Sequence, residues 1–197
     1  MSTLWANDDP HAWSDALATY PDVVAAQGVS RLTDLDTWYR EEFPQQIAAR
    51  TPHRITHEEL VQVTEWKMKR GVWRARNLAL VRGNDPDEVV RLSTEGFALL
   101  PDTRKPLARI AQLAGVGPAT ASAVLASLRP EIYPFFDELI ADQIPGLGAV
   151  AFTASYYARY AEQLRERAKQ LSAANALWTA HAAGQALWAA AGGKGAT

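Results

Sequence analysis

The chain contains no cysteine among its 197 residues. This absence excludes a disulfide framework, a thiolate zinc site and a cysteine-ligated iron–sulfur cluster. Charge of one sign is not in excess either, because 20 Lys and Arg face 22 Asp and Glu, for a net charge of −2. A protein that coats nucleic acid by charge alone is therefore excluded, whereas local phosphate contacts through backbone amides remain open.

Long uninterrupted apolar runs are also missing. The most apolar stretch, 173–191, is rich in alanine and is interrupted by Asn175, Thr179, His181 and Gln185. Because a membrane span needs about 20 clearly apolar residues, we expect a packed helix here, with His181 inside it. The start, "MSTLWANDDPHAW", lacks the basic and apolar segments of a secretory signal. We therefore expect a soluble monomer without a membrane partner, in the cytoplasm with the nucleoid, or in the nucleus of a eukaryote.

The chain is rich in helix signals. Hydrophobic residues make up 48% of it, enough to bury a core, and they recur at helical spacing. Thr56 and Glu59 have the spacing of a capping box, and Asp85 followed by Pro86 is a second helix start. No alternating run predicts a sheet, the segment 131–140 stays ambiguous, and no internal repeat is found. Helices are predicted over 31–49, 56–71, 84–100, 103–115, 118–128, 153–172 and 173–191.

These patterns predict one all-α domain over 1–197, compact and two-lobed, with short connections. We expect residues 1–50 to form a helical extension packed on the rest. The end of the chain, "GGKGAT", is expected to fray.

The segment "LAGVGPATASAVL", residues 113–125, predicts a tight turn between two apolar helices. Gly115 can adopt positive φ without a steric cost, and Val116 would anchor the turn between the helices. Gly117 leaves the backbone bare where the second helix begins, and Pro118 suits its first turn. The free amides at that helix start favour an anion such as a DNA phosphate. The alternative is a turn that binds nothing. The predicted DNA contacts are Gly115, Val116, Gly117, Ala119 and Thr120.

This segment, followed by Asp137 in "YPFFDEL" twenty residues after Gly117, resembles the helix-hairpin-helix DNA glycosylase superfamily. The hairpin itself spans 105–128, and the resemblance is clear over about 105–142. It implies an all-α, two-lobed fold that binds DNA between its lobes and uses Asp137 in catalysis. Ala119 stands where bifunctional members carry a lysine, so the resemblance implies a monofunctional enzyme. "EWKMKRG" together with "GVGPATASAVL" is similar to a poorly characterised branch. No cofactor is implied except a monovalent cation at the hairpin.

A carboxylate at Asp137 suits base excision. Breaking an N-glycosidic bond builds positive charge on the sugar, which a carboxylate stabilises while it orients water. The base must first leave the stack and enter a pocket. The alternative is that Asp137 only caps a helix over "ELIADQI". The candidates for the base pocket are Trp66, Tyr133, Phe135, Phe136 and Glu138.

The stretch "EWKMKRGVWRAR", residues 65–76, is the second informative one. Lys67 and Arg70 are three residues apart, so they can share a helix face and line a DNA cleft. The alternative is a solvated helix end whose cations favour the dipole, with Glu65 paired to Lys69. His53 and His57 are four residues apart, but Thr56 is expected to cap a helix between them, so they do not share a helix face and no metal site is predicted.

The sequence therefore favours a DNA-binding protein of this glycosylase type, a hydrolase of base excision repair that removes a damaged or modified base. Two alternatives stay open. One keeps the DNA contact without the chemistry, and the other is a helical protein-interaction module whose hairpin is only structural.

Overall fold

The computed structural model describes residues 4–173 and 177–194, and within these ranges the chain is all helical, with no strand. The all-α prediction is thus confirmed. The elements are η1 (Leu4–Ala6), α1 (Pro10–Ala18), α2 (Tyr20–Ala26), α3 (Leu32–Ala48), α4 (His57–Arg70), α5 (Ala75–Arg82), α6 (Pro86–Ala98), α7 (Lys105–Ile110), α8 (Pro118–Leu128), α9 (Glu138–Ala141), α10 (Ala154–Ser172) and α11 (Ala180–Ala190).

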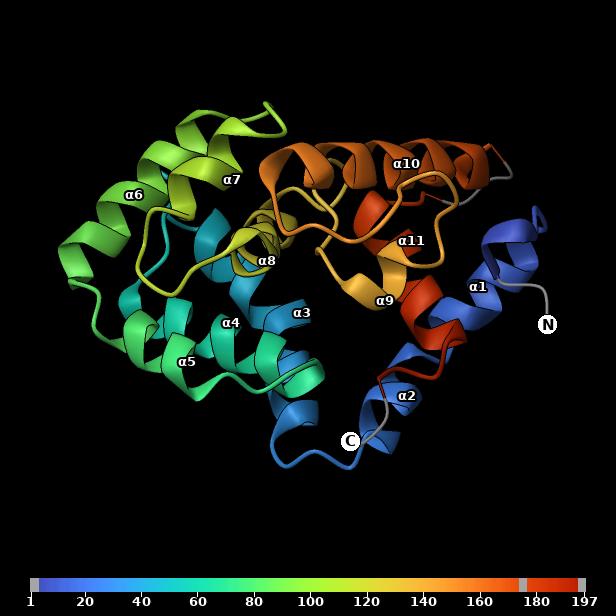
Figure 1. The fold of residues 1–197 in the computed structure, drawn as a ribbon, viewed down its shortest axis with the longest axis horizontal. Coiled ribbons are helices and arrows are strands. Elements are labelled where there is room, and N and C mark those ends of the chain that lie inside the picture. The colour runs from blue at the N-terminus through green and yellow to red at the C-terminus, as the bar shows by residue number, and fades with distance from the viewer. Residues whose placement is uncertain (1–3, 174–176, 195–197) are drawn as a thin grey trace.

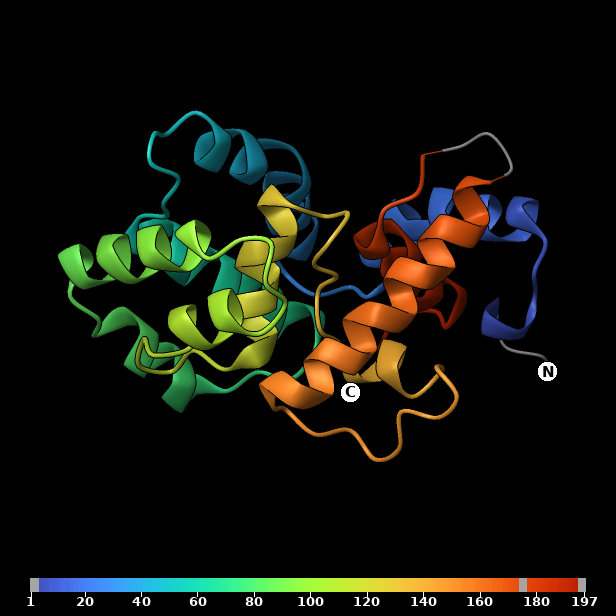
Figure 2. The same ribbon diagram turned by 90° about the horizontal axis from the view of Figure 1, so that it is seen from above.

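The helices pack as two groups (Figures 1 and 2). Helices α3 to α8 form the first group, and α1, α2, α9 and α10 surround α11 in the second. The chain starts in the second group, crosses after α2, and returns after α8 through residues 129–137. Residues 1–50 therefore contribute helices to both groups, because α1 and α2 pack with α11 while α3 packs with α4 and α8.

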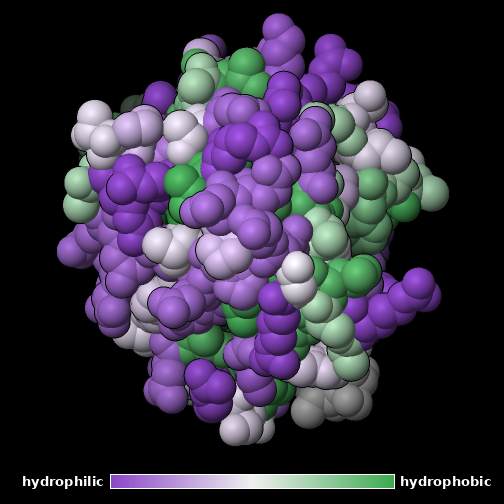
Figure 3. Space-filling view, turned by 90° about the vertical axis from the view of Figure 1, so that its left-hand side faces the viewer, coloured by the Kyte–Doolittle hydropathy of each residue, from purple (hydrophilic) through white to green (hydrophobic). Residues whose placement is uncertain are grey.

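Helix α8 lies at the centre of the first group. Nine of its 11 residues are buried, as expected of a helix that is apolar all round. Helices α3, α4 and α7 pack against it. Polar side chains gather instead on the outer side of this group, which is largely hydrophilic in Figure 3. The start of α8 is therefore fixed in space by a well-packed core.

The local start signals are confirmed. Thr56 caps α4 and Glu59 returns a hydrogen bond to the Thr56 amide, which is a complete capping box. The Asp85 side chain accepts hydrogen bonds from the amides of Asp87 and Glu88. Helix α3 continues through Pro44 without ending there.

Other boundaries differ from the prediction. The helix expected over 103–115 ends at Ile110, because the residues up to Gly117 form the turn. The ambiguous segment 131–140 is irregular up to Asp137 and then forms α9. The helix expected over 173–191 spans Ala180–Ala190, and residues 174–176 lie outside the described ranges. Helix α5 was not predicted. No helix of residues 4–173 and 177–194 is long and apolar enough to span a bilayer.

The end of the chain was predicted to fray, but residues 192–194 form hydrogen bonds and an ion pair with the rest of the fold. Gly192 and Gly193 adopt positive φ, and their amides bond to the carbonyl oxygens of Ala189 and Trp188. Lys194 then forms an ion pair with Glu138. Residues 195–197 lie outside the described ranges.

Candidate functional site

The predicted turn at Gly115 is confirmed, and glycine is required there for two reasons. Its φ is +75°, and a Cβ atom would lie 2.5 Å from the carbonyl oxygen of Asn77 and 2.9 Å from the Cβ of Leu80. Asn84 holds the turn from the side, since its Nδ2 donates to the carbonyl oxygen of Ala114 at 2.9 Å and its Oδ1 accepts from the Ala114 amide at 2.8 Å. Val116 is buried, as an anchor should be. The turn is thus pinned against α5.

Gly117 has a different reason to be glycine. Its backbone is extended and a Cβ atom would meet nothing within 4 Å. Among the described residues, none accepts a hydrogen bond from the amides of Gly117, Ala119 or Thr120. Pro118 occupies the first position of α8, as predicted. Backbone amides without a partner therefore lie at the positive end of the α8 dipole, beside the open space that a Cβ atom on Gly117 would enter.

The monovalent cation expected at the hairpin stays a prediction. Two carbonyl oxygens of the turn already accept hydrogen bonds, Leu113 from the Val116 amide at 3.1 Å and Ala114 from Asn84.

Two hollows meet at the start of α8. The first has a volume of about 190 Å³ and is lined by Gly115, Gly117 and Thr120 of the hairpin. The second, of about 50 Å³, is lined by Asp137 and Glu138. Both hollows are also lined by the same four residues, so they are neighbours on the surface. We call the two together the α8 groove. The shared residues are Lys67, Arg74, Ala119 and Phe152.

Two cations of the groove are without an ion pair among the described residues, namely Lys67 and Arg74. Burial and the neighbouring charge of Arg74 lower the pKa of Lys67. A phosphate in the groove would relieve this repulsion. Lys194 adds a third cation at the edge of the smaller hollow, where its partner Glu138 has its pKa lowered by that contact.

Asp137 both caps α9 and lines the groove, so the two interpretations of this residue are compatible. Its Oδ1 accepts from the Leu139 amide at 2.9 Å. Its Oδ2 lies 3.6 Å from Nε of Arg70, in an ion pair whose two side chains are almost fully buried. Asp137 itself is 6% exposed and reaches the wall of the smaller hollow.

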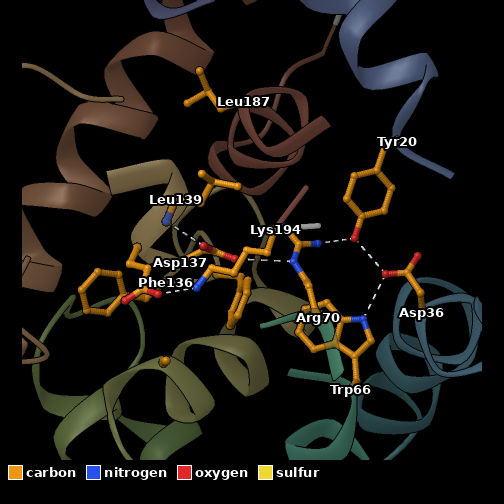
Figure 4. Close-up of polar contacts among 12 residues, drawn as sticks. Tyr20, Asp36, Trp66, Arg70, Phe136, Asp137, Leu139, Leu187 and Lys194 are labelled. Atoms are coloured by element: carbon orange, nitrogen blue, oxygen red, sulfur yellow. Dashed lines mark hydrogen bonds and ion pairs between the residues drawn. The ribbon is translucent and has the colours of Figure 1, made fainter. Parts of the chain in front are cut away.

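The prediction that Arg70 contacts DNA is not supported by its position, because Arg70 is buried and only 3% exposed. It lies behind Asp137 and its Nη1 donates to the hydroxyl of Tyr20 (Figure 4). That hydroxyl donates in turn to Asp36 Oδ1 at 2.8 Å. Burial opposes the charge of Arg70, but Tyr20, Asp137 and Asp36 outweigh it and raise its pKa. Rings within 5.5 Å of its guanidinium carbon belong to Tyr20, Trp66, Phe135 and Trp188.

Two of the predicted base-pocket residues are not available to a base. Trp66 is fully buried, stacks on Tyr39 with ring centroids 3.7 Å apart, and donates to Asp36. Tyr133 is also buried, and its hydroxyl donates to the carbonyl oxygen of Asp102. The side chains that do line the smaller hollow among those predicted are Phe135, Phe136 and Glu138.

Sequence reasoning missed three charged or aromatic residues of the groove. Arg74 was within the basic stretch but was not selected, and Phe152, which is 48% exposed, carries no local signal. Lys194 sits in a tail expected to fray. The predicted pair of Glu65 with Lys69 is wrong as well, because Glu65 pairs with Arg82 at 2.6 Å and Lys69 donates to the Ser30 carbonyl oxygen.

His181 is half-buried in α11, where it lines a hollow together with Tyr39 and Gln185. Its Nδ1 accepts from the Phe135 amide at 3.2 Å, and burial lowers its pKa to about 3. The pKa of His181 in the unfolded state is about 6.5. At pH values between about 3 and 6.5, the unfolded state therefore binds a proton at His181 and the folded state does not. Stability from His181 is therefore full above the unfolded pKa and is lost as the pH falls below it.

We expect the free energy of unfolding to decrease by about 2–3 kcal/mol more in the wild type than in His181→Gln between pH 6.5 and 4.5. Urea denaturation of both proteins at several pH values measures this. If the free energy of unfolding depended on pH in the same way in both proteins, folding would not shift the pKa of His181.

The α8 groove thus brings a turn with free amides, unpaired cations and a carboxylate into one surface feature. In the part of the chain that the structure describes, no three His, Asp or Glu side chains are grouped so that they could hold a metal ion. Comparison with protein-family models, curated proteins and solved structures found no match to this chain.

Proposed function

We propose that this protein binds DNA in the α8 groove and excises a base from it without cutting the strand, as a helix-hairpin-helix glycosylase would. The observation that carries the proposal is that the hollow beside the hairpin and the hollow lined by Asp137 are neighbours that share four lining residues. The amides of Gly117, Ala119 and Thr120 would hold a backbone phosphate, with Lys67 and Arg74 beside it.

Asp137 would supply the chemistry. Its carboxylate faces the groove while Arg70 lies behind it, so a sugar that gains positive charge meets a fixed negative charge. A carboxylate oxygen of Asp137 can also orient the attacking water. Ala119 stands at the position where the resemblance places the lysine of bifunctional members, which is the reason to expect excision without strand cleavage.

The size of the smaller hollow favours a second candidate, a DNA-binding protein without excision. A volume of about 50 Å³ corresponds to one or two water molecules and not to a base, since one water occupies about 30 Å³ of liquid. A base would enter only if a wall moved. The Lys194–Glu138 ion pair and the exposed Phe152 ring stand at that edge.

One experiment separates the two candidates. The protein is incubated with a panel of duplexes that each carry one damaged or modified base, and alkali then cleaves any abasic site formed. Binding to the same duplexes is measured by fluorescence anisotropy. Excision on one substrate supports the enzyme, binding without excision on any supports the second candidate, and no binding overturns both.

The hairpin contact predicts the effect of Gly117→Val. Because a Cβ at this position meets nothing within 4 Å and the backbone is extended, the fold should tolerate valine. A branched side chain would still block the approach of a phosphate to the amides. We expect at least a tenfold loss of DNA affinity, since hydrogen bonds to charged groups contribute about 1.5–3 kcal/mol. The DNA affinity of Gly117→Ala should lie between that of the wild type and that of Gly117→Val. Wild-type affinity in a normally folded valine variant would contradict the contact.

If Lys67 and Arg74 contact phosphates, replacing them should change how DNA affinity depends on salt concentration. Replacing Lys67 and Arg74 with Gln should lower the slope of log affinity against log salt by about 1.8 units, at about 0.9 per contact. The matched control replaces Arg54 and Lys169, which line neither hollow and carry the same total charge. Equal slopes in the two double variants would remove Lys67 and Arg74 from the DNA contact.

A further inference from the structure

The hairpin turn has a second copy later in the chain, which sequence inspection alone overlooked. The segment "AQLAGVG" begins at residue 111, and "DQIPGLG" begins 31 residues later at 142. Both contain the pattern Gln–aliphatic–X–Gly–aliphatic–Gly. The matched pairs are Gln112 and Gln143, Leu113 and Ile144, Gly115 and Gly146, Val116 and Leu147, and Gly117 and Gly148.

The two copies also fold alike. Each follows a helix, α7 or α9, and each continues it with hydrogen bonds between residues three apart, at 3.2 Å for Leu113 to Ile110 and 3.1 Å for Ile144 to Ala141. Gly115 and Gly146 take the same left-handed conformation, with φ of +75° and +82°. The aliphatic residues of both turns are buried. The likeness holds up to the first glycine of each pair and ends at the second, because Gly148 has a φ of +73° whereas Gly117 is extended with a φ of −104°.

The second turn is the more open of the two. A Cβ atom on Gly146 or Gly148 would meet nothing within 4 Å, whereas Gly115 is pressed against α5. No described residue accepts a hydrogen bond from the amides of Gly146, Leu147 or Gly148. No helix begins directly after this turn, because residues 149–153 are irregular and α10 starts at Ala154. Its amides thus lack the help of a helix dipole.

Two arginines supply positive charge beside this turn instead. Arg104 and Arg159 line a hollow of about 550 Å³ together with Gly146 and Leu147. Neither arginine forms an ion pair with a described residue, and Arg159 lies over the ring of Tyr156 at 5.3 Å. The carboxylate in the hollow, Glu162, is already paired with Arg165. Two exposed guanidinium groups are therefore unoccupied at an open backbone turn.

We propose that this turn and these arginines form a second contact for DNA backbone phosphates, outside the α8 groove. The inference rests on the proposed DNA binding. A guanidinium group binds phosphate through two parallel hydrogen bonds, and unpaired amides of a turn add donors. One loop joins the two sites, because Phe152 lines the α8 groove and Gly146 lines the new hollow. Figure 2 shows this loop at the edge of the molecule, below α9 and α10.

The test compares two double variants that lose the same charge, Arg104→Gln with Arg159→Gln and the control Arg54→Gln with Lys169→Gln. Each is titrated with a duplex longer than the protein at several salt concentrations, by fluorescence anisotropy. We expect the first variant to lose about 1.8 units of log–log salt slope relative to the control, at about 0.9 per contact. Hydroxyl-radical footprinting should show loss of protection at phosphates distinct from those lost with Lys67 and Arg74.

The outcomes separate this inference from the proposed function. If the wild type binds DNA but the Arg104 and Arg159 variant matches the control in slope and footprint, the second contact is overturned and the groove is not. A footprint loss that coincides with that of the Lys67 and Arg74 variant would overturn it too, because the two sites would then be one. If the wild type does not bind DNA, the proposed function fails and this contact with it.

Discussion

Replacing Arg70 with methionine should lower the free energy of unfolding by about 3–5 kcal/mol, the usual cost of removing one partner from a buried ion pair. Asp137 would lose the cation 3.6 Å from its Oδ2. Tyr20 would lose the donor to its hydroxyl. Methionine retains apolar volume among the four rings, so the loss reports the charge more than a cavity.

Arg40 provides the matched control for this measurement. It too forms an ion pair, with Asp36 through Nε at 2.7 Å, but its side chain is 29% exposed. Arg40→Met should therefore cost much less than Arg70→Met in urea denaturation. Equal costs would show that the buried network around Arg70 contributes no more than a partly exposed ion pair does.

The position of Arg70 also shows what sequence cannot decide. Lys67 and Arg70 are three residues apart on α4, and that spacing places them near each other on the helix. It does not say which part of the surface is covered. Contacts with Tyr20 and Trp188, from the other group of helices, bury Arg70 while Lys67 reaches the groove. Trp66 was misassigned for the same reason.

Features with local causes were predictable. The capping box of Thr56 and Glu59 and the left-handed turn at Gly115 depend on residues close in sequence, and both are present. Lys194 could not be predicted, because its place depends on Glu138, which is far away in the chain. The second turn also has a signal in the sequence, "DQIPGLG", although no helix begins directly after it.

The exchange Asp137→Asn distinguishes an enzyme from a DNA binder. Asparagine keeps a side-chain oxygen for the Leu139 amide, so α9 stays capped. It removes the charge that a positively charged sugar requires, and we expect excision to slow by about a hundredfold or more. DNA affinity should hold or rise, because a carboxylate also leaves the groove that would receive phosphates.

Stability must be measured alongside the rate, because Asp137→Asn also leaves Arg70 with less compensation in the core. Glu138→Gln is the matched control, since it removes a carboxylate from the same hollow without a contact to Arg70. Single-turnover excision is compared at a temperature where all three proteins are folded, on a substrate found with the duplex panel. A slow Asp137→Asn beside a fast Glu138→Gln assigns the chemistry to Asp137. Equal rates for Asp137→Asn and wild type would remove Asp137 from the mechanism. If the panel yields no substrate, a rise in DNA affinity of Asp137→Asn would still place this carboxylate at the bound DNA, and the non-catalytic candidate would stand.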